Sequence, residues 1–94
     1  MTTPDAHKTV RLRYWAAAAH AAGTEIDEIA VTGPVTLSRL TEQASSLHPD
    51  RRFADVLATC SVLVGDQPVS SGEPDQVLIH PGQQVEFLPP FAGG

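Results

Sequence analysis

Residues 82–94 read Gly82-Gln83-Gln84-Val85-Glu86-Phe87-Leu88-Pro89-Pro90-Phe91-Ala92-Gly93-Gly94. After the turn at Gly82, apolar and polar side chains alternate as in a half-buried strand. Val85 and Phe87 share one face of Gln84–Leu88. Two prolines follow, and they end a strand because proline lacks the N–H that a sheet needs. This segment therefore predicts a final strand that leads directly into a tail.

The tail, residues 89–94, combines a stiff part with a slim part. Pro89-Pro90 hold the backbone extended because their φ angles are fixed, whereas Gly93-Gly94 have no side chains and allow any backbone angle. Such a tip fits a narrow tunnel in another protein, where the terminal carboxylate reacts as an acyl group. An ordinary frayed terminus fits the glycines equally well. Large apolar groups beside this tail, Leu88 and Phe91, are expected to dock in partner pockets, with Phe91 as the anchor.

The region from residue 8 to residue 31 predicts two paired strands around a short helix. The two faces of the first strand alternate as Val10/Arg11, Leu12/Arg13 and Tyr14/Trp15. Ala16–Ala22, followed by Gly23, is typical of one or two helical turns closed by a glycine. In residues 25–31 we expect a second strand, with Ile29 and Val31 inward and Asp27 outward.

A longer helix is predicted after the break at Gly33-Pro34. Thr36 is placed to cap it, and it ends near His48-Pro49. Its apolar positions have the spacing of one buried stripe, and they are Leu37, Leu40, Ala44 and Leu47. A further short turn of helix is expected around Phe53, Val56 and Leu57.

The remaining segments complete an α+β, β-grasp-like arrangement. Ser61–Val64 predicts a buried strand stopped by Gly65-Asp66, residues 65–76 the longest loop, and residues 77–79 a short strand. Strands on either side of one main helix imply a mixed sheet of four to five strands curled over that helix. We expect a flexible lead-in at residues 1–7, the β-grasp domain at residues 8–88 and a projecting tail at residues 89–94.

Composition excludes several classes of protein. Ninety-four residues with 41% hydrophobic content suit one small domain, and a net charge of −5 argues against a nucleic-acid-binding protein. No apolar run has the length of a membrane span, and the first residues lack a signal-peptide pattern. The single cysteine, Cys60, has the setting of a small core residue, so we expect a cytoplasmic protein without a disulfide.

Other candidate sites carry weaker signals. The histidines have no ligand-like spacing, so no metal site is predicted; they are His7, His20, His48 and His80. Asp27-Glu28 is interpreted as a solvated strand edge, because adjacent strand residues point to opposite faces. Arg11, Arg13 and Trp15 share a face that either binds a partner or covers the sheet.

The quoted C-terminal segment, the order of elements and the turn after Val62-Leu63-Val64-Gly65 resemble the MoaD/ThiS family of ubiquitin-like sulfur carriers over residues 8–94. The Pro89-Pro90 pair is most similar to the MoaD branch, the small subunit of molybdopterin synthase. Gln83 stands where family members usually carry an acidic residue, and Gly65-Asp66 where an asparagine-containing turn is common. Both differences lie in turns that tolerate polar exchange.

The resemblance implies a carrier cycle in molybdenum cofactor biosynthesis. An adenylating enzyme of the ubiquitin-activating type would use ATP on the carboxylate of Gly94, and a sulfur donor protein would then supply the sulfur for a thiocarboxylate. Gly93 would let the tail enter the large subunit of molybdopterin synthase. Residues expected to contact partners are Leu88, Pro89, Pro90, Phe91 and Ala92. The chain itself would bind no cofactor and supply no catalytic side chain.

Three other functions fit the same sequence. A sulfur carrier for thiazole (thiamine), cysteine or another sulfur metabolite would use the same chemistry. A ubiquitin-like modifier would join its C-terminus to a target lysine, and a plain binding module would have an incidental tail.

Overall fold

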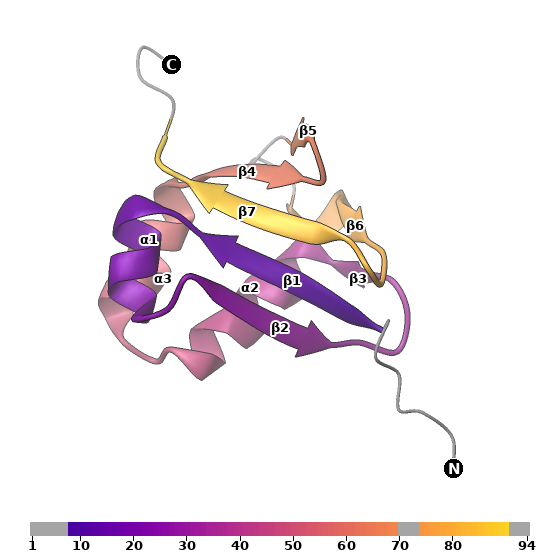
Figure 1. The fold of residues 1–94 in the computed structure, drawn as a ribbon, viewed down its shortest axis with the longest axis horizontal. Helices are drawn as coiled ribbons and strands as arrows, with labels where there is room; N and C mark the ends of the chain where they lie inside the picture. Colours follow the sequence, from indigo (N-terminus) through magenta and orange to yellow (C-terminus); the bar gives the residue numbers. More distant parts are fainter. Residues whose placement is uncertain (1–7, 70–73, 91–94) are drawn as a thin grey trace.

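A computed structural model describes residues 8–69 and 74–90. The elements in chain order are β1 (Thr9–Tyr14), α1 (Ala16–Ala22), β2 (Ile26–Ala30), β3 (Val35–Thr36), α2 (Leu37–Leu47), α3 (Arg51–Thr59), β4 (Ser61–Val64), β5 (Gln67–Val69), the 3-10 turn η1 (Pro74–Gln76), β6 (Leu78–Ile79) and β7 (Gln84–Leu88). A five-stranded mixed sheet has the order β2-β1-β7-β4-β5, and β3 and β6 form a second, two-stranded sheet (Figure 1). The predicted α+β, β-grasp architecture is confirmed. The predicted lead-in at residues 1–7 lies outside the described residues.

Strand β7 occupies the centre of the sheet. It runs parallel to β1, with Phe87 opposite Tyr14, and antiparallel to β4, with Leu88 opposite Ser61. Strand β2 pairs antiparallel with β1, as the sequence predicts. The alternation predicted for β1 and β7 is also confirmed, because Leu12, Tyr14, Val85 and Phe87 are all buried.

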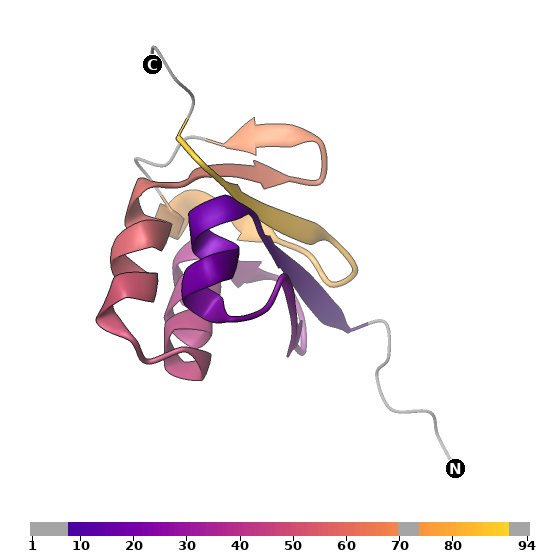
Figure 2. The same ribbon diagram turned by 60° about the vertical axis from the view of Figure 1, so that its left-hand side comes forward.

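The core lies between the sheet and the helices, which gather on one face of the sheet (Figure 2). Its centre is aromatic. The ring of Tyr14 meets that of Phe53 edge-on with centroids 5.3 Å apart, and it stacks against Phe87 at 5.8 Å. Such offset and edge-to-face pairs stabilise a core beyond the burial of their area. Leu40 from α2 is fully buried beside them in the same core.

Helices α2 and α3 begin at polar caps, and the Thr36 cap of α2 was predicted. The Thr36 hydroxyl accepts a hydrogen bond from the Arg39 N–H at 3.1 Å, which satisfies one of the free N–H groups of the first turn of α2. The Asp50 carboxylate accepts from the Arg52 N–H at 2.8 Å and begins α3. Helix α1 ends at Gly23, whose φ of 75° lies in the left-handed region that glycine adopts without strain. In the described residues no helix has both the length and the apolar character to cross a bilayer.

Several expectations about these elements are wrong. Helix α3 has nine residues instead of a further short turn. The predicted loop at residues 65–76 contains β5, which pairs with β4, and the short strand β3 was not predicted. Leu47 does not complete the buried stripe of α2, because it lies at the last position of the helix and stays 53% exposed.

The prediction that Asp27 points outward is wrong. Asp27 shares a face with Ile29, two residues along β2, and its carboxylate side chain is only 18% exposed. The Tyr14 hydroxyl donates to Asp27 Oδ2 at 2.7 Å, and His48 Nε2 lies 2.6 Å from the same oxygen. This cluster, the Tyr14–Asp27–His48 clamp, joins β1, β2 and the end of α2 through one carboxylate. Burial, together with the Asp27 carboxylate, raises the pKa of Tyr14.

The clamp and the core predict a loss of stability in alkali. Burial also raises the pKa of the Cys60 thiol. In an unfolded chain, a thiol and a phenol lose their protons near about pH 8.5 and about pH 10. The folded state keeps both protons longer, so each group lowers the free energy of unfolding by up to about 1.4 kcal/mol per pH unit above those values. Below these pH values, the stabilising contribution of each group is fully present.

Urea unfolding between about pH 7 and about pH 11 measures this slope. The double variant Tyr14→Phe, Cys60→Ala should give a flatter profile above about pH 8.5 than the unmodified chain. Equal slopes in the two proteins would contradict the assignment.

Candidate functional site at the end of strand β7

The chain leaves the sheet at the end of β7, beside the start of α1 (Figure 1). Because β1 and β7 are parallel, they end at the same edge of the sheet. The backbone N–H of Trp15 donates to the Phe87 carbonyl at 3.0 Å, which holds the end of β7 against the end of β1. Leu88 is half-buried, and Pro89 and Pro90 are exposed. The folded domain therefore stops within one residue of the point where the prolines begin.

Of the residues predicted to contact partners, one lies in the sheet, two are exposed beyond it and two lie outside the described residues. Leu88 belongs to the sheet, so part of its side chain is already packed against its own domain. Pro89 and Pro90 are free to lie against another protein. Phe91 and Ala92, and the predicted reactive Gly93 and Gly94, lie outside the described residues.

Polar side chains surround this exit on the outer face of the sheet. The Arg13 guanidinium lies over the Trp15 ring, 4.3 Å from its centroid, and the Trp15 indole N–H donates to Glu86 Oε1 at 2.9 Å. Glu86 was missed in the sequence analysis, although it lies directly opposite Arg13 in the register of β1 and β7. Arg13 and Trp15 thus cover the sheet, and Trp15 remains 39% exposed for a partner.

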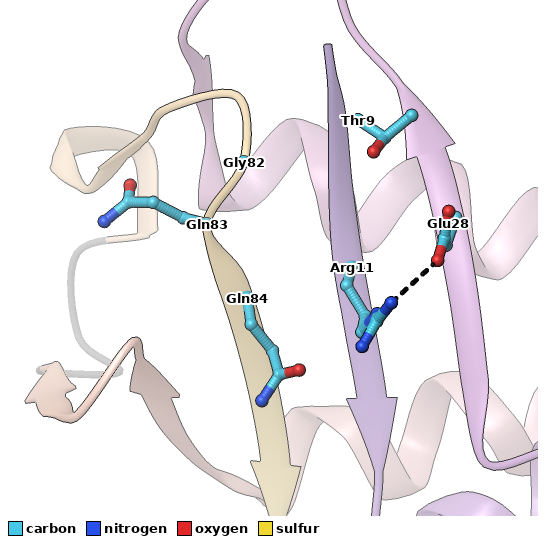
Figure 3. A pocket seen from close by; sticks show the side chains of 6 residues that line it. All are labelled: Thr9, Arg11, Glu28, Gly82, Gln83 and Gln84. Carbon is cyan, nitrogen blue, oxygen red and sulfur yellow. Dashed lines mark hydrogen bonds and ion pairs between the residues drawn. The ribbon is translucent and has the colours of Figure 1, made fainter. Parts of the chain in front are cut away.

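A polar depression of about 360 Å³ lies at the opposite end of the sheet from the exit. Figure 3 shows the residues that line it, which are Thr9, Arg11, Glu28, Gly82, Gln83 and Gln84. The ionisable side chains in this lining, Arg11 and Glu28, pair with each other at 3.1 Å. The described lining of the depression therefore consists of this exposed ion pair, a threonine hydroxyl, a glycine and two amides, with no histidine or cysteine among them.

The remaining candidate side chains are not gathered into a site. Cys60 is buried, as predicted, and burial raises the pKa of its thiol, so it has little thiolate to react. His20 and His80 are exposed at separate places, and His48 belongs to the Tyr14–Asp27–His48 clamp. Within residues 8–69 and 74–90, no three His, Cys, Asp or Glu side chains lie together in a way that would hold a metal ion.

Comparison with known protein families identifies the chain. The model of the ThiS family matches residues 12–94, which include β7 and the whole tail. The chain belongs to the ThiS family. A molybdopterin synthase sulfur carrier subunit from Aspergillus niger is 31% identical to it over 86 residues, covering 92% of this chain and 94% of that protein. This ThiS-family chain thus resembles a molybdopterin synthase subunit along nearly its whole length.

Solved structures confirm the ubiquitin-like β-grasp fold. The small archaeal modifier protein 1 of Haloferax volcanii superposes with a TM-score of 0.71 at 16% identity, over 88% of this chain and 98% of the other. A chain from the complex of subunits 1 and 2 of the molybdopterin-converting factor of Helicobacter pylori gives 0.59 at 19% identity, over 92% and 99%. At these identities the likeness shows the fold of this ThiS-family chain and nothing of its activity.

The position of Leu88 in β7 predicts that its side chain contributes to the stability of the domain, whereas the side chain of Pro90 does not. Leu88→Ala removes a half-buried side chain from β7 and should lower the free energy of unfolding by about 1 kcal/mol. Pro90→Ala removes an exposed ring and should change it by less than about 0.5 kcal/mol. Urea unfolding of the two variants measures both effects. If Leu88→Ala were as neutral as Pro90→Ala, Leu88 would belong to the tail and not to the domain.

Proposed function

We propose that this chain is a sulfur carrier that acts in the cytoplasm as the small subunit of molybdopterin synthase. The observation that carries the proposal is the 31% identity to a molybdopterin synthase sulfur carrier subunit over nearly the full length of both chains. Membership of the ThiS family supports the same chemistry. The proposed partners are an adenylating enzyme, a sulfur donor protein and the large subunit of the synthase.

The proposed reaction uses the terminal carboxylate and no side chain. A carboxylate oxygen of Gly94 attacks the α-phosphorus of ATP in the partner's site, which gives an acyl adenylate and releases pyrophosphate. The outer sulfur of a persulfide on the donor protein then attacks the activated carbonyl carbon and displaces AMP, which gives an acyl disulfide. A second thiol attacks the donor's own sulfur in that S–S bond, so a disulfide forms between the donor and this thiol and the thiocarboxylate is released. Adenylation is needed because a free carboxylate has no good leaving group. Gly93 and Gly94 present this group without a Cβ that would widen the partner's tunnel.

The geometry of the exit sets the reach of the tail. Pro90 is the last described residue, and four residues follow it. A chain of four residues spans at most about 14 Å, so a partner's reactive site must come within that distance of Pro90. A partner that comes this close to Pro90 also lies near the exit, where Trp15 and part of Leu88 are exposed. We therefore propose that it contacts this rim of the domain in addition to the tail.

Deleting Gly94 tests the carrier chemistry. The domain ends at Leu88, so the deletion should leave the unfolding curve unchanged while it abolishes formation of the thiocarboxylate. The measurement is the intact mass of protein isolated from its native cells, where replacement of one oxygen by sulfur at the C-terminus is expected only in the full chain. A lysine adduct would instead indicate a modifier. Sulfur on the deleted protein would overturn the assignment of Gly94.

Replacing Phe91 tests the expected anchor. Phe91→Ala should weaken binding to a purified molybdopterin synthase large subunit by about 30-fold or more, because buried aromatic anchors commonly contribute about 2 kcal/mol or more. Leu78→Ala is the control, since Leu78 is an exposed apolar side chain on β6. Calorimetric titration of both variants measures the difference. Equal affinities of Phe91→Ala and the unmodified chain would refute the anchor.

A further inference from the structure

Strand β2 is the terminal strand of the five-stranded sheet, so within residues 8–69 and 74–90 no strand pairs with its outer edge. Its register with β1 shows which backbone groups face outward. Glu25 O accepts from the Tyr14 N–H and the Val31 N–H donates to Lys8 O, both at 2.8 Å. In an antiparallel pair, alternate residues bond to the same neighbour, so the N–H and C=O groups of Glu28 and Ala30 point to the open edge. Unused strand edges of this kind readily accept another strand.

A groove of about 350 Å³ runs along this edge, between β2 and α2. Its lining residues are Glu28, Ile29, Ala30, Gln43 and Leu47. Leu47 is 53% exposed there. The Gln43 side-chain oxygen itself is buried, and within the described residues it has no hydrogen-bond partner. The groove thus offers an apolar surface next to the two outward-facing backbone positions of Glu28 and Ala30.

Charge at the edge selects among possible occupants. Glu25 is exposed, and the Glu28 side chain remains 52% exposed although it pairs with Arg11. A second copy paired antiparallel and centred on Glu28 would place the two Glu28 side chains directly opposite each other, and opposed like charges destabilise a strand pair. A segment with a basic residue opposite Glu28 gains an ion pair instead. The edge therefore favours a basic segment over a copy of itself.

We propose that the β2 edge is a second docking surface, which binds an extended segment of a partner protein as an added strand. Because strand side chains alternate between faces, aliphatic residues of that segment pack on Leu47 in the groove, and basic residues lie on the outer face opposite Glu28. Backbone hydrogen bonds to Glu28 and Ala30 provide affinity, as in other cases of strand addition. This inference goes beyond the proposed sulfur-carrier function, because it uses no residue of the tail. Strand β1 separates β2 from β7, so the β2 edge and the exit of the tail are distinct surfaces.

Titration with a seven-residue peptide of alternating valine and lysine, VKVKVKV, tests the surface on the full chain. Amide shifts in a two-dimensional NMR spectrum should concentrate at Glu28, Ala30 and Leu47. Leu47→Ala should weaken binding by at least about 5-fold through loss of apolar contact, whereas Leu78→Ala should have no effect. Leu78 is a matched control, because it is 54% exposed but lies on β6 outside the groove. The acidic peptide VEVEVEV should not bind.

A second variant tests the backbone contacts. Ala30→Pro removes an N–H that points to the open edge, where proline is tolerated in a strand, so the fold should persist while peptide binding is lost. Two results would overturn the proposal. One is a set of peptide shifts outside β2 and α2, or shifts that Leu47→Ala and Ala30→Pro leave intact. The other is broadening of the Glu28 and Ala30 amides with protein concentration in the absence of peptide, which would assign the edge to a second copy.

Discussion

The parallel pairing of β1 with β7 is the constraint on which the rest of this structure depends. Parallel neighbours cannot be joined by a tight turn, so the chain between them must cross over the sheet. Here that crossover contains every other element of the domain. The pairing also brings the ends of β1 and β7 together, which places Trp15 beside Phe87. One choice of strand direction therefore sets both the order of the fold and the position from which the tail departs.

The polar groups of the domain act mainly to hold this arrangement. Asp27 Oδ2 accepts a hydrogen bond from the Tyr14 hydroxyl and also contacts His48 Nε2. Strands β1 and β2 and the end of α2 are therefore joined at a single carboxylate. On the opposite face, Glu86 and Arg13 hold the indole of Trp15. Tyr14, Asp27, His48 and Glu86 thus act in structure, and the chemistry proposed for the chain uses its terminus. The open edge of β2 remains as a separate binding surface.

Much of the fold could be predicted from the sequence, because a long periodic pattern of apolar residues distinguishes a strand from a helix. The alternation around Tyr14 and Phe87 and the cap at Thr36 predicted their elements correctly. Strands β3 and β5 are too short for a period, and Pro68 made β5 look like a loop, although proline is tolerated at a sheet edge. Asp27 was predicted to point outward, whereas its spacing of two residues from Ile29 places both side chains on one face of β2. At the site, pattern located the exit of the tail, but the contact between Trp15 and Glu86 depends on a register that only the structure supplies.

The central place of β7 also has a mechanical consequence. Strand β1 begins at one end of the sheet, and the parallel strand β7 finishes at the other (Figure 1). A force that pulls on the tail therefore acts along β7 and loads its hydrogen bonds to β1 and β4 in shear, all at once, instead of opening them one after another. Traction on the C-terminus by a bound partner meets the most resistant direction of the domain. A pull on this end should therefore leave the folded domain intact.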